Sequence, residues 1–386
     1  MKSETNRVQT SHIKKGWTSL SQREMPLHMT QNSGYKLLEP AFPEKNVAVF
    51  CSTSVAYALY CGVMLHSLLE HASPEWNYDL VVLESELPEE CKAKIARLAE
   101  GRSNVSLRFF NMDPVVGDAE LPVYEDYGIP VNAWYRIWAP EVFQRYERVV
   151  YLDLDILVQR DVAELALLDI GDAWLAACPD YGVRAAASDP KLVAYFRDEV
   201  GVQEVSRYVN DGVMLLNIRA MIRHRVGVDR LLVAAQKRFR WLDQDVFNHV
   251  CQGHIHYLDA RWNALASRFF EHQLSAEDLA ELLHAREHAA ILHYVAGTKP
   301  WAAPEIDYAS LWWAAARRSP YYEEIMFSRF RGMLRDAAHY GFYKRRHFWC
   351  RLVSHITWGK MRRKWEMRKR VYRACLLRAE RALKAL

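Results

Sequence analysis

The sequence predicts an α/β protein built on a doubly wound sheet, and three observations lead to this fold class. Short apolar runs, of the kind that form buried parallel strands, recur along the chain. Segments whose apolar residues have helical spacing lie between these runs. The chain has 386 residues, of which 51% are hydrophobic, so it can bury one large core or two modest ones. Such alternation of strands and helices is typical of α/β sheets.

A polar stretch without sustained periodicity comes first and predicts a flexible or loosely docked leader over residues 1–45. Ordered structure is expected to begin near Asn46. Apolar runs bounded by polar residues predict the first strands, and helical spacing predicts the helices between them. We expect these strands at residues 47–51, 79–83 and 105–110, and the helices at residues 57–69 and 89–99.

The second half of the pattern contains a polar interruption. We expect helices at residues 133–143 and 244–251, and strands at residues 148–152, 174–178, 212–217, 255–258 and 290–293. The strand at 148–152 runs directly into Asp153, Leu154 and Asp155. Because ligands of open α/β sheets bind at the carboxyl ends of strands, this acidic pair lies where a binding site is expected.

The two carboxylates Asp153 and Asp155 can both face one cation if the backbone departs from strict strand alternation between them. They interrupt an apolar segment that continues at residues 156–158, and charge in such a place needs compensation by a metal or a partner. Carboxylate oxygens suit Mg²⁺ or Mn²⁺, which usually also contact a substrate phosphate. The alternative for an isolated pair of this kind is a solvated turn that caps the next helix.

Residues 293–301 contain a second group of polar side chains. His293 offers an imidazole ligand, Gly297 permits close approach of a ligand to the backbone, and Lys299 could neutralise a phosphate. Taken singly, a histidine such as His293 is more often a hydrogen-bonded core residue, and a lysine such as Lys299 is more often a solvated charge.

Four motifs together carry a resemblance to a known family. They are YLDLDILV at 151–158, YVNDGVMLLNI at 208–218, LDQDVFN at 242–248 and HYVAGTKPW at 293–301. In this order, within the stretch from about Asn46 to Trp301, they resemble the retaining glycosyltransferases of family 8, which include bacterial lipopolysaccharide galactosyl- and glucosyltransferases and glycogenin. The resemblance implies a GT-A nucleotide-sugar-binding fold, a Rossmann-like mixed sheet flanked by helices. The implied catalytic domain covers residues 46–305, and a helical extension follows at residues 306–386.

The resemblance also implies the site residues. Asp153, Asp155 and His293 match the family's metal ligands, for Mn²⁺ or Mg²⁺. The implied donor is a UDP-sugar carrying galactose or glucose. Its binding residues are implied to be Ser52, Thr53, Ser54, Tyr57, Arg136, Asp153, Leu154, Asp155, Gly297 and Lys299. The residues implied at the transferred sugar, as catalytic candidates, are Asp180, Asn210, Asp243 and Gln244.

One departure concerns the nucleobase. The family usually has an acidic pair after its first strand, whereas Thr53 and Ser54 stand at these positions here. Tyr57 can still stack on a base, so UDP stays the expected nucleotide, with weaker uridine selectivity. For the chemistry we expect front-face attack, in which the departing phosphate oxygen takes the acceptor proton. The family's candidate for a covalent intermediate is the amide of Gln244, which is a poor nucleophile.

The charge of the chain is strongly asymmetric. Residues 341–386 contain 15 Lys or Arg and 2 acidic residues, so the overall net charge of +4 leaves −9 for the preceding part. Apolar residues recur there at intervals of three or four, mainly at Trp358, Met361, Trp365, Tyr372, Leu376, Ala379, Leu383 and Leu386. This pattern predicts a basic amphipathic helix on an anionic membrane. A domain-packing helix and nucleic-acid binding are the alternatives, of which the second is disfavoured because the aromatic residues avoid the basic face.

The remaining features bear on location. Seven scattered cysteines without a CxxC pair disfavour a disulfide framework or a zinc site and fit a reducing cytoplasm. The first residues lack the apolar stretch of a signal peptide, and no long apolar run predicts a transmembrane helix. We therefore expect a cytoplasmic enzyme, peripheral on the inner face of the membrane, with a glycolipid such as lipopolysaccharide core or an oligosaccharide as acceptor. The main alternative is a non-catalytic sugar-nucleotide-fold binding protein tethered by its basic tail. A nucleotidyltransferase or phosphohydrolase would explain only the acidic pair.

Overall fold

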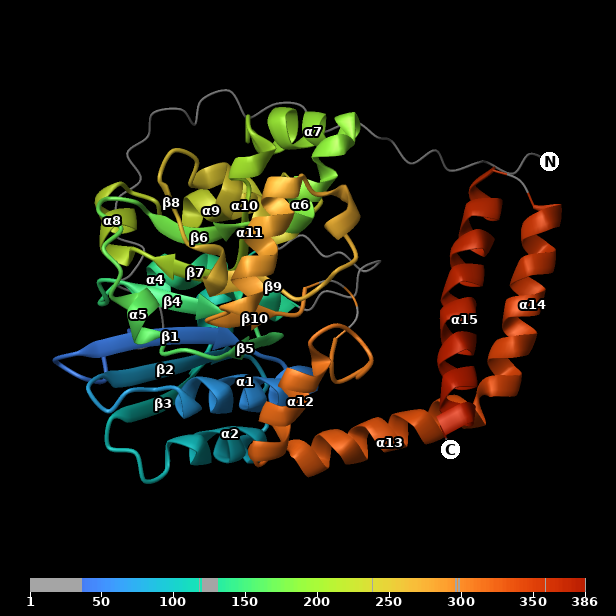
Figure 1. Ribbon diagram of the computed structural model, residues 1–386, viewed down its shortest axis with the longest axis horizontal. Helices are drawn as coiled ribbons and strands as arrows, with labels where there is room; N and C mark the ends of the chain where they lie inside the picture. Colours follow the sequence, from blue (N-terminus) through green and yellow to red (C-terminus); the bar gives the residue numbers. More distant parts are fainter. Residues whose placement is uncertain are drawn as a thin grey trace, which may run out of the picture. The chain divides into compact units, whose positions relative to one another are not determined.

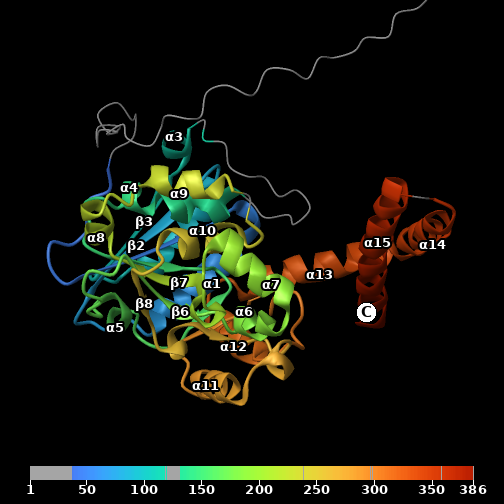
Figure 2. The ribbon, with the colours of Figure 1, turned by 90° about the horizontal axis from the view of Figure 1, so that it is seen from above.

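The structure is a computed structural model that describes residues 37–117, 119, 131–237, 239–295, 297, 299–357 and 359–385. Its centre is a seven-stranded mixed sheet with helices on both sides; α4 (Ala139–Val142) and α9 (Val228–Ala235) lie on one side, α11 (Ala276–Glu287) and α12 (Ala309–Arg318) on the other (Figures 1 and 2). In spatial order the strands are β3 (Val105–Asn111), β2 (Asn77–Glu84), β1 (Asn46–Ser52), β4 (Val149–Leu152), β7 (Val209–Leu216), β6 (Leu175–Pro179) and β8 (Ile255–Tyr257). The predicted α/β fold class is confirmed.

The strand directions bring four predicted segments to one edge of this sheet. β1 and β4 are parallel, so Ser52 and Asp153 both lie at the strand ends. β7 is antiparallel to β4 and β6, and it pairs Val213 with Leu152, so its first residues extend past the end of β4. β6 runs in the direction of β4, and Asp180 follows its last residue. The sequence motifs therefore meet at the carboxyl edge of the sheet.

A second, three-stranded sheet lies beside the first and was not predicted as a unit. It consists of β5 (Ile156–Val158), β10 (Ile291–His293) and β9 (Ala264–Leu265), in this order. β5 is the apolar run that follows Asp155, and it pairs antiparallel with β10 so that Ile156 lies opposite His293. This pairing brings together residues more than 130 positions apart.

The helices follow the predicted alternation with one exception. The other helices before the C-terminal region are α1 (Ala58–Glu70), α2 (Glu89–Ala96), α3 (Asp113–Val116), α5 (Ala163–Ala166), α6 (Tyr181–Ala185), α7 (Pro190–Tyr195), α8 (Ile218–Arg223) and α10 (Leu242–Val250). The helix predicted at 133–143 is instead a 3₁₀-helix, Val131–Trp138, followed by the short α4. Pro140 lies in the first turn of α4, where a proline without an N–H is tolerated, so its position agrees with a new helix that begins after Trp138.

The described end of the leader contacts the sheet. The backbone N–H of Ala41 donates to Asp79 on β2, and the carbonyl of Glu39 accepts from Arg108 and from the Tyr146 hydroxyl. The rest of the predicted leader lies outside the described residues.

The C-terminal region contains α13 (Tyr322–Ala338), α14 (Tyr340–Ile356) and α15 (Gly359–Ala385), of which α14 and α15 pack against each other. The prediction of a single basic helix in this region is therefore wrong, because the region forms the two helices α14 and α15. The chain reverses after Thr357, which is extended, and Gly359 has a positive φ of 56°, a conformation that glycine adopts without strain.

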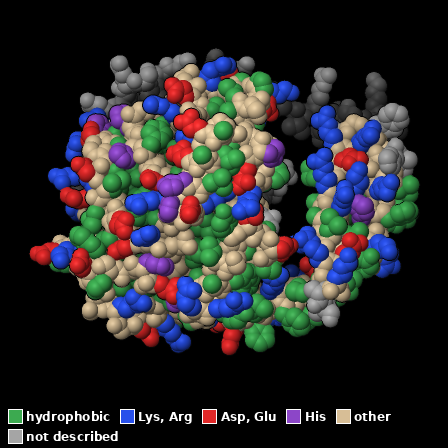
Figure 3. All heavy atoms as spheres, in the orientation of Figure 1, with side chains coloured by type: hydrophobic (Ala, Val, Ile, Leu, Met, Phe, Trp, Pro, Cys, Tyr) green, Lys and Arg blue, Asp and Glu red, His purple; other side chains and the backbone are tan. Residues whose placement is uncertain are grey.

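This hairpin changes which apolar side chains face outward. On α15, Trp365, Tyr372 and Leu376 are only partly exposed, and Ala379 is buried. Tyr372 contacts the ring of Phe342. Trp358 and Leu386 of the expected stripe lie outside the described residues, whereas Met361 and Leu383 are exposed. Helix packing thus accounts for much of the stripe, and Lys and Arg side chains dominate the visible hairpin surface (Figure 3).

Candidate active site

The acidic pair stands between the two sheets. The backbone N–H of Asp153 donates to Gly212 on β7, and the carbonyl of Asp155 accepts from Tyr294, which follows β10. Asp153 is thereby attached to the large sheet and Asp155 to the small one. The carboxylates converge because the chain crosses from one sheet to the other between them.

Asp153, Asp155 and His293 form a compact set of three candidate metal ligands, referred to below as the ligand triad. The Nε2 atom of His293 lies 3.3 Å from Asp155 Oδ1 and 3.7 Å from Asp153 Oδ2. One ligand atom from each residue lies within 4.8 Å of the others, so one ion can contact all three. Two carboxylate oxygens and an imidazole nitrogen are a donor set suited to Mn²⁺, and also accept Mg²⁺.

Asn263, which the sequence analysis missed, orients His293. Its side-chain oxygen accepts from Nδ1 of His293 at 2.8 Å, so Nε2 is the ring nitrogen that faces the acids. The amide nitrogen of Asn263 donates to Asn210 at 2.8 Å. The only signal in the sequence was a polar residue just before the two-residue strand β9, which is too short to recognise from periodicity.

Gly212 makes room for these ligands. A Cβ atom at this position would lie 2.3 Å from Cε1 of His293 and 2.7 Å from Oδ2 of Asp153. Both distances are shorter than any real Cβ contact, so a side chain here would displace two of the three ligand residues. The glycine of the 208–218 motif is thus required by close packing.

Arg136, on the 3₁₀-helix before β4, is surrounded by three carboxylates. Nη2 lies 2.9 Å from Asp153, Nη1 lies 3.1 Å from Asp211, and Nε lies 2.8 Å from Asp243. Its guanidinium also covers the ring of Tyr151 at 4.2 Å. The predicted site residues Arg136, Asp153 and Asp243 are therefore in contact, and Asp211 is a further member that the sequence analysis did not identify.

Burial and neighbouring positive charges shift the pKa values of the acids in opposite directions. Burial alone would raise the pKa of Asp155, but Lys299 and His293 outweigh it and hold that pKa below its ordinary value. Burial raises the pKa of Asp211 well above its ordinary value and also raises that of Asp243, while Arg136 opposes both changes. The site thus contains four carboxyl groups, on Asp153, Asp155, Asp211 and Asp243, and two basic side chains, Arg136 and Lys299, and a divalent cation would favour the ionised form of these acids.

The loop after β10 contributes the second cation. Lys299 forms an ion pair with Oδ2 of Asp155, and its Nζ donates to the carbonyl of Tyr294 at 2.9 Å. Trp301 stacks on Tyr60 with ring centroids 3.9 Å apart and meets the edge of Tyr57. The loop therefore joins the metal ligands to the segment expected at the nucleobase. Gly297 is exposed, and no atom would crowd a Cβ there.

The residues expected near the nucleobase lie at the end of β1 with unequal access. Ser52 and Thr53 are buried, and the Thr53 hydroxyl donates to the carbonyl of Ser54. Ser54 and Tyr57 are partly exposed. Leu154, between the two acids, is buried, so it could serve a ligand mainly through its backbone. The donor contacts of these residues stay predictions.

Three of the four residues expected at the transferred sugar form one hydrogen-bonded network, whereas the fourth, Asp243, pairs with Arg136. The Asn210 amide donates to Asp180 at 3.0 Å and to Gln244 at 3.1 Å, and the Gln244 amide donates to Asp180 at 3.1 Å. Asp180 also caps α6 by accepting from Val183. Through Asn263 the same network reaches His293. The structure therefore brings Asp180, Asn210 and Gln244 together beside the ligand triad.

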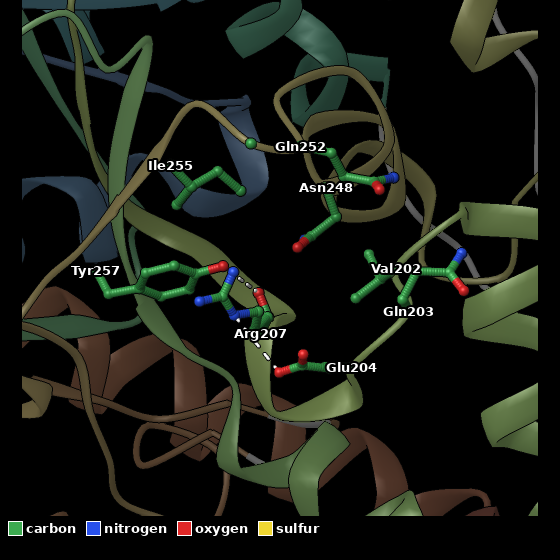
Figure 4. A pocket seen from close by; sticks show the side chains of 9 residues that line it. Val202, Gln203, Glu204, Arg207, Asn248, Gln252, Ile255 and Tyr257 are labelled. Atoms are coloured by element: carbon green, nitrogen blue, oxygen red, sulfur yellow. Dashed lines mark hydrogen bonds and ion pairs between the residues drawn. The ribbon is translucent and has the colours of Figure 1, made fainter.

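Two other features lie away from this site. A pocket of about 190 Å³ opens beside the edge strand β8, between Tyr257 and the end of α10 (Figure 4). The hydroxyl of Tyr257 donates to the carbonyl of Arg207, and Arg207 pairs with Glu204. The second feature is an exposed cluster on α11 and just after it, of His284, Glu287 and His288. Neither contains a residue of the ligand triad.

Relatives from bacteria resemble most of this chain. General stress protein A of Bacillus subtilis is 25% identical over 253 residues, which are 64% of this chain and 84% of that protein. A lipopolysaccharide 1,2-glucosyltransferase of Escherichia coli is 22% identical over 252 residues, which are 64% of this chain and 70% of that protein.

Solved structures show the same fold. The apo structure of the bifunctional glycosyltransferase WbbM superposes with a TM-score of 0.70 at 24% identity and covers 76% of this chain, which spans only 53% of that one. The galactosyltransferase LgtC, solved with donor and acceptor sugar analogues, superposes with a TM-score of 0.57 at 23% identity, covering 71% of this chain and 96% of LgtC. The fold is thus of the GT-A type, with a central mixed sheet and C-terminal helices. Since the family model described as Glycosyl transferase family 8 matches residues 48–304, this chain belongs to that family and is a glycosyltransferase.

Proposed function

We propose that this enzyme transfers a hexose, galactose or glucose, from a UDP-sugar to a saccharide acceptor with retention of the anomeric configuration. The observation that carries the proposal is the position of the ligand triad beside the network of Asp180, Asn210 and Gln244. One half of this edge suits a metal and a diphosphate, and the other half offers hydrogen-bonding groups to a sugar. Family membership favours an enzyme over the binding-protein alternative.

The residues present fit a divalent cation. The number of carboxyl groups, the His293 ring oriented by Asn263 and the space left by Gly212 all support this fit. Asp153, Asp155 and His293 would hold Mn²⁺ or Mg²⁺, which would neutralise negative charge on the departing diphosphate. Lys299 lies on the same side and would bind the diphosphate, where it stabilises the leaving group further.

The proposed chemistry is front-face attack. The bond between the anomeric carbon and the β-phosphate oxygen breaks, the acceptor oxygen bonds to the same face of that carbon, and the acceptor proton moves to the departing phosphate. Gln244 supports this route over a covalent intermediate, because its amide is held by Asn210 and Asp180 and is a poor nucleophile. Its oxygen would instead stabilise the sugar as positive charge develops.

The donor assignment has a direct test. Thermal unfolding is measured with UDP-glucose, UDP-galactose and UDP, with Mn²⁺ or with EDTA. A ligand at about 100 times its Kd stabilises the native state by about 2.7 kcal/mol. We expect stabilisation and sugar release with Mn²⁺ and a UDP-hexose, and neither with EDTA. No stabilisation and no turnover with any donor would contradict the proposal.

The nucleobase can be tested with the same method. Thr53 and Ser54 offer no carboxylate to the base or ribose, so we propose weaker uridine selectivity than the family norm. Equal stabilisation by UDP and GDP would support this proposal, and strict preference for UDP would contradict it.

For the acceptor we propose a membrane glycolipid such as a lipopolysaccharide core, reached from the inner face of the membrane. None of the described helices is long and apolar enough to cross a bilayer. Support comes from the outer face of α14, where Phe348 and Trp349 are exposed one helical turn after the exposed Arg345, and Leu352 is exposed one turn later. Exposed aromatic residues next to basic ones suit an anionic lipid surface. The name of the Escherichia coli relative agrees with such an acceptor.

Point variants test this surface. Replacing Phe348 and Trp349 together by Ser should reduce co-sedimentation with phosphatidylglycerol vesicles and leave donor hydrolysis unchanged. The matched control is the double replacement of Phe327 and Phe330 on α13, which are also exposed. Unchanged sedimentation, or an equal loss in the control, would contradict attachment through α14. Binding to DNA without binding to vesicles would favour nucleic acid as the partner.

A further inference from the structure

Asp211 is the residue of the site that the proposed chemistry does not use. Its side chain is 8% exposed, and its Oδ2 atom is buried without a hydrogen bond in the described structure. This atom lies 3.1 Å from Nη1 of Arg136, and the carbonyl of Asp211 accepts from the same nitrogen at 3.3 Å. Because solvent does not reach Oδ2, a substrate would not reach it either. Any role of this carboxylate in the reaction must pass through Arg136.

Arg136 in turn determines the orientation of Asp153. Oδ1 of Asp153 accepts from Nη2 of Arg136 at 2.9 Å and from the Tyr151 hydroxyl at 2.7 Å. With Oδ1 occupied, Oδ2 is the oxygen that faces His293. The guanidinium therefore selects which carboxylate oxygen enters the ligand triad.

Asp211 and Asp243 hold the guanidinium from its other sides. Arg136 is 7% exposed, and its three nitrogens are divided among three different carboxylates. An arginine side chain has several rotatable bonds, so one contact with Asp153 would leave it free to turn. Contacts on all three nitrogens allow one position.

We propose that Asp211 is a positioning residue: together with Asp243 it holds Arg136 against Oδ1 of Asp153 and so increases the affinity of the site for a divalent cation. The inference rests on the proposed metal-dependent function. Loss of Asp211 loosens Asp153, because the guanidinium that holds Oδ1 of Asp153 is then held by one carboxylate fewer. Loss of partners that orient metal ligands typically weakens metal binding by about 10- to 100-fold.

The test measures Mn²⁺ affinity without donor, by the electron paramagnetic resonance signal of free Mn²⁺. We expect Asp211→Ala to weaken binding about 10-fold. Asp211→Asn, which keeps an oxygen for Arg136, should recover part of the loss and serves as the second variant if Asp211→Ala does not fold. Thermal unfolding of each variant without metal confirms that it is folded.

Asp245→Ala is the matched control. Asp245 is also a buried acid, but it accepts from the hydroxyls of Tyr195 and Tyr208 and is not one of the three acids that pair with Arg136 in the described structure. This variant should lower the melting temperature and leave the Mn²⁺ affinity unchanged. An equal loss of affinity in both alanine variants would reduce Asp211 to a general structural role and overturn the inference.

A double-mutant cycle with Arg136→Gln tests the route through the guanidinium. If Asp211 acts through Arg136, the double variant should bind Mn²⁺ no more weakly than Arg136→Gln alone. Additive losses would overturn the inference, as would an affinity of Asp211→Ala within twofold of the unmodified enzyme. Absence of Mn²⁺ binding by the unmodified enzyme would overturn the metal-dependent function and this inference together.

Discussion

Asp153 and Asp155 are separated by one residue, yet their surroundings differ. Oδ1 of Asp153 is held inside the core by Arg136 and Tyr151, and Arg136 is shared with two further acids. Oδ2 of Asp155 is held by Lys299, which lies on a loop and has Asp155 as its acidic partner. In both acids the other oxygen faces His293. One side of the triad is built into the sheet, and the other depends on a loop.

This difference suggests a division of roles. A buried arginine between three carboxylates cannot leave without exposing unpaired charge, so it maintains the geometry of the site. Lys299 is 18% exposed and can exchange Asp155 for a diphosphate once a metal takes over the charge of that acid. We therefore expect changes beside Asp153 to affect metal affinity and stability, and changes at Lys299 to affect the donor.

The largest effect should follow from removing the negative charge of Asp155, a proposed metal ligand. Asp155→Asn keeps the shape of the side chain and removes a proposed metal ligand, so activity should fall by about 10³-fold, equivalent to about 4 kcal/mol. Turnover of a UDP-hexose with Mn²⁺ is the measurement, and Asp169→Asn on the surface is the control. Activity within tenfold of the unmodified enzyme would remove Asp155 from the metal site.

The next effect tests the space between the two acids. Gly212→Ala would place a methyl group against His293 and Asp153, so Mn²⁺ affinity should fall by about 10- to 100-fold. The melting temperature should fall as well, because the clash also strains the core. Gly332→Ala on α13 is the control, since no atom would crowd its Cβ. Normal Mn²⁺ affinity of Gly212→Ala would mean that the triad does not bind the ion in this arrangement.

Lys299→Ala tests whether the loop side of the site binds the donor, while the side attached to the large sheet determines metal affinity. Loss of a charge-assisted contact of about 2 kcal/mol corresponds to an increase in donor KM of about 30-fold. Donor-free Mn²⁺ affinity should stay equal or rise, since Lys299 competes with the ion for Asp155. A loss of Mn²⁺ affinity with an unchanged KM would show that Lys299, like Arg136, orients its acid.

The smallest effect is expected at Tyr151. Tyr151→Phe removes one hydrogen bond to Asp153, worth about 1 kcal/mol or roughly a fivefold change in Mn²⁺ affinity. Arg136 still holds the same oxygen, so activity should persist. A loss as large as that of Asp211→Ala would assign the orientation of Asp153 to the tyrosine instead of the arginine.

Local patterns were enough to predict most of the large sheet. The apolar runs at β1, β2, β3 and β4 lie within two residues of the predicted strands, because buried strands have few polar residues to obscure them. The small sheet was missed as a unit because β9 has two residues and its partners are far apart in sequence. The basic tail had the right periodicity, yet the turn near Gly359 makes two helices of it.

The candidate site likewise contains residues that the sequence was enough to propose and residues that only the fold identifies. Asp153, Asp155, His293 and Lys299 could be proposed from motif resemblance, since each is chemically distinctive and occurs in a recognisable motif. Asn263 and Asp211 could not, because an asparagine or aspartate in a strand or turn has many ordinary uses. Their roles depend on which side chains the fold places beside them.

Sequence alone therefore determined the alternating α/β pattern, the residues to propose as metal ligands and the uneven charge, all of which are encoded by neighbouring residues. The tertiary structure decided which oxygen of each acid faces His293, how Asn263 and Arg136 orient the ligands, and which apolar residues of the tail stay exposed. These features arise from contacts between residues distant in sequence, and the physical reason is that orientation and burial are properties of packing, which no local pattern specifies.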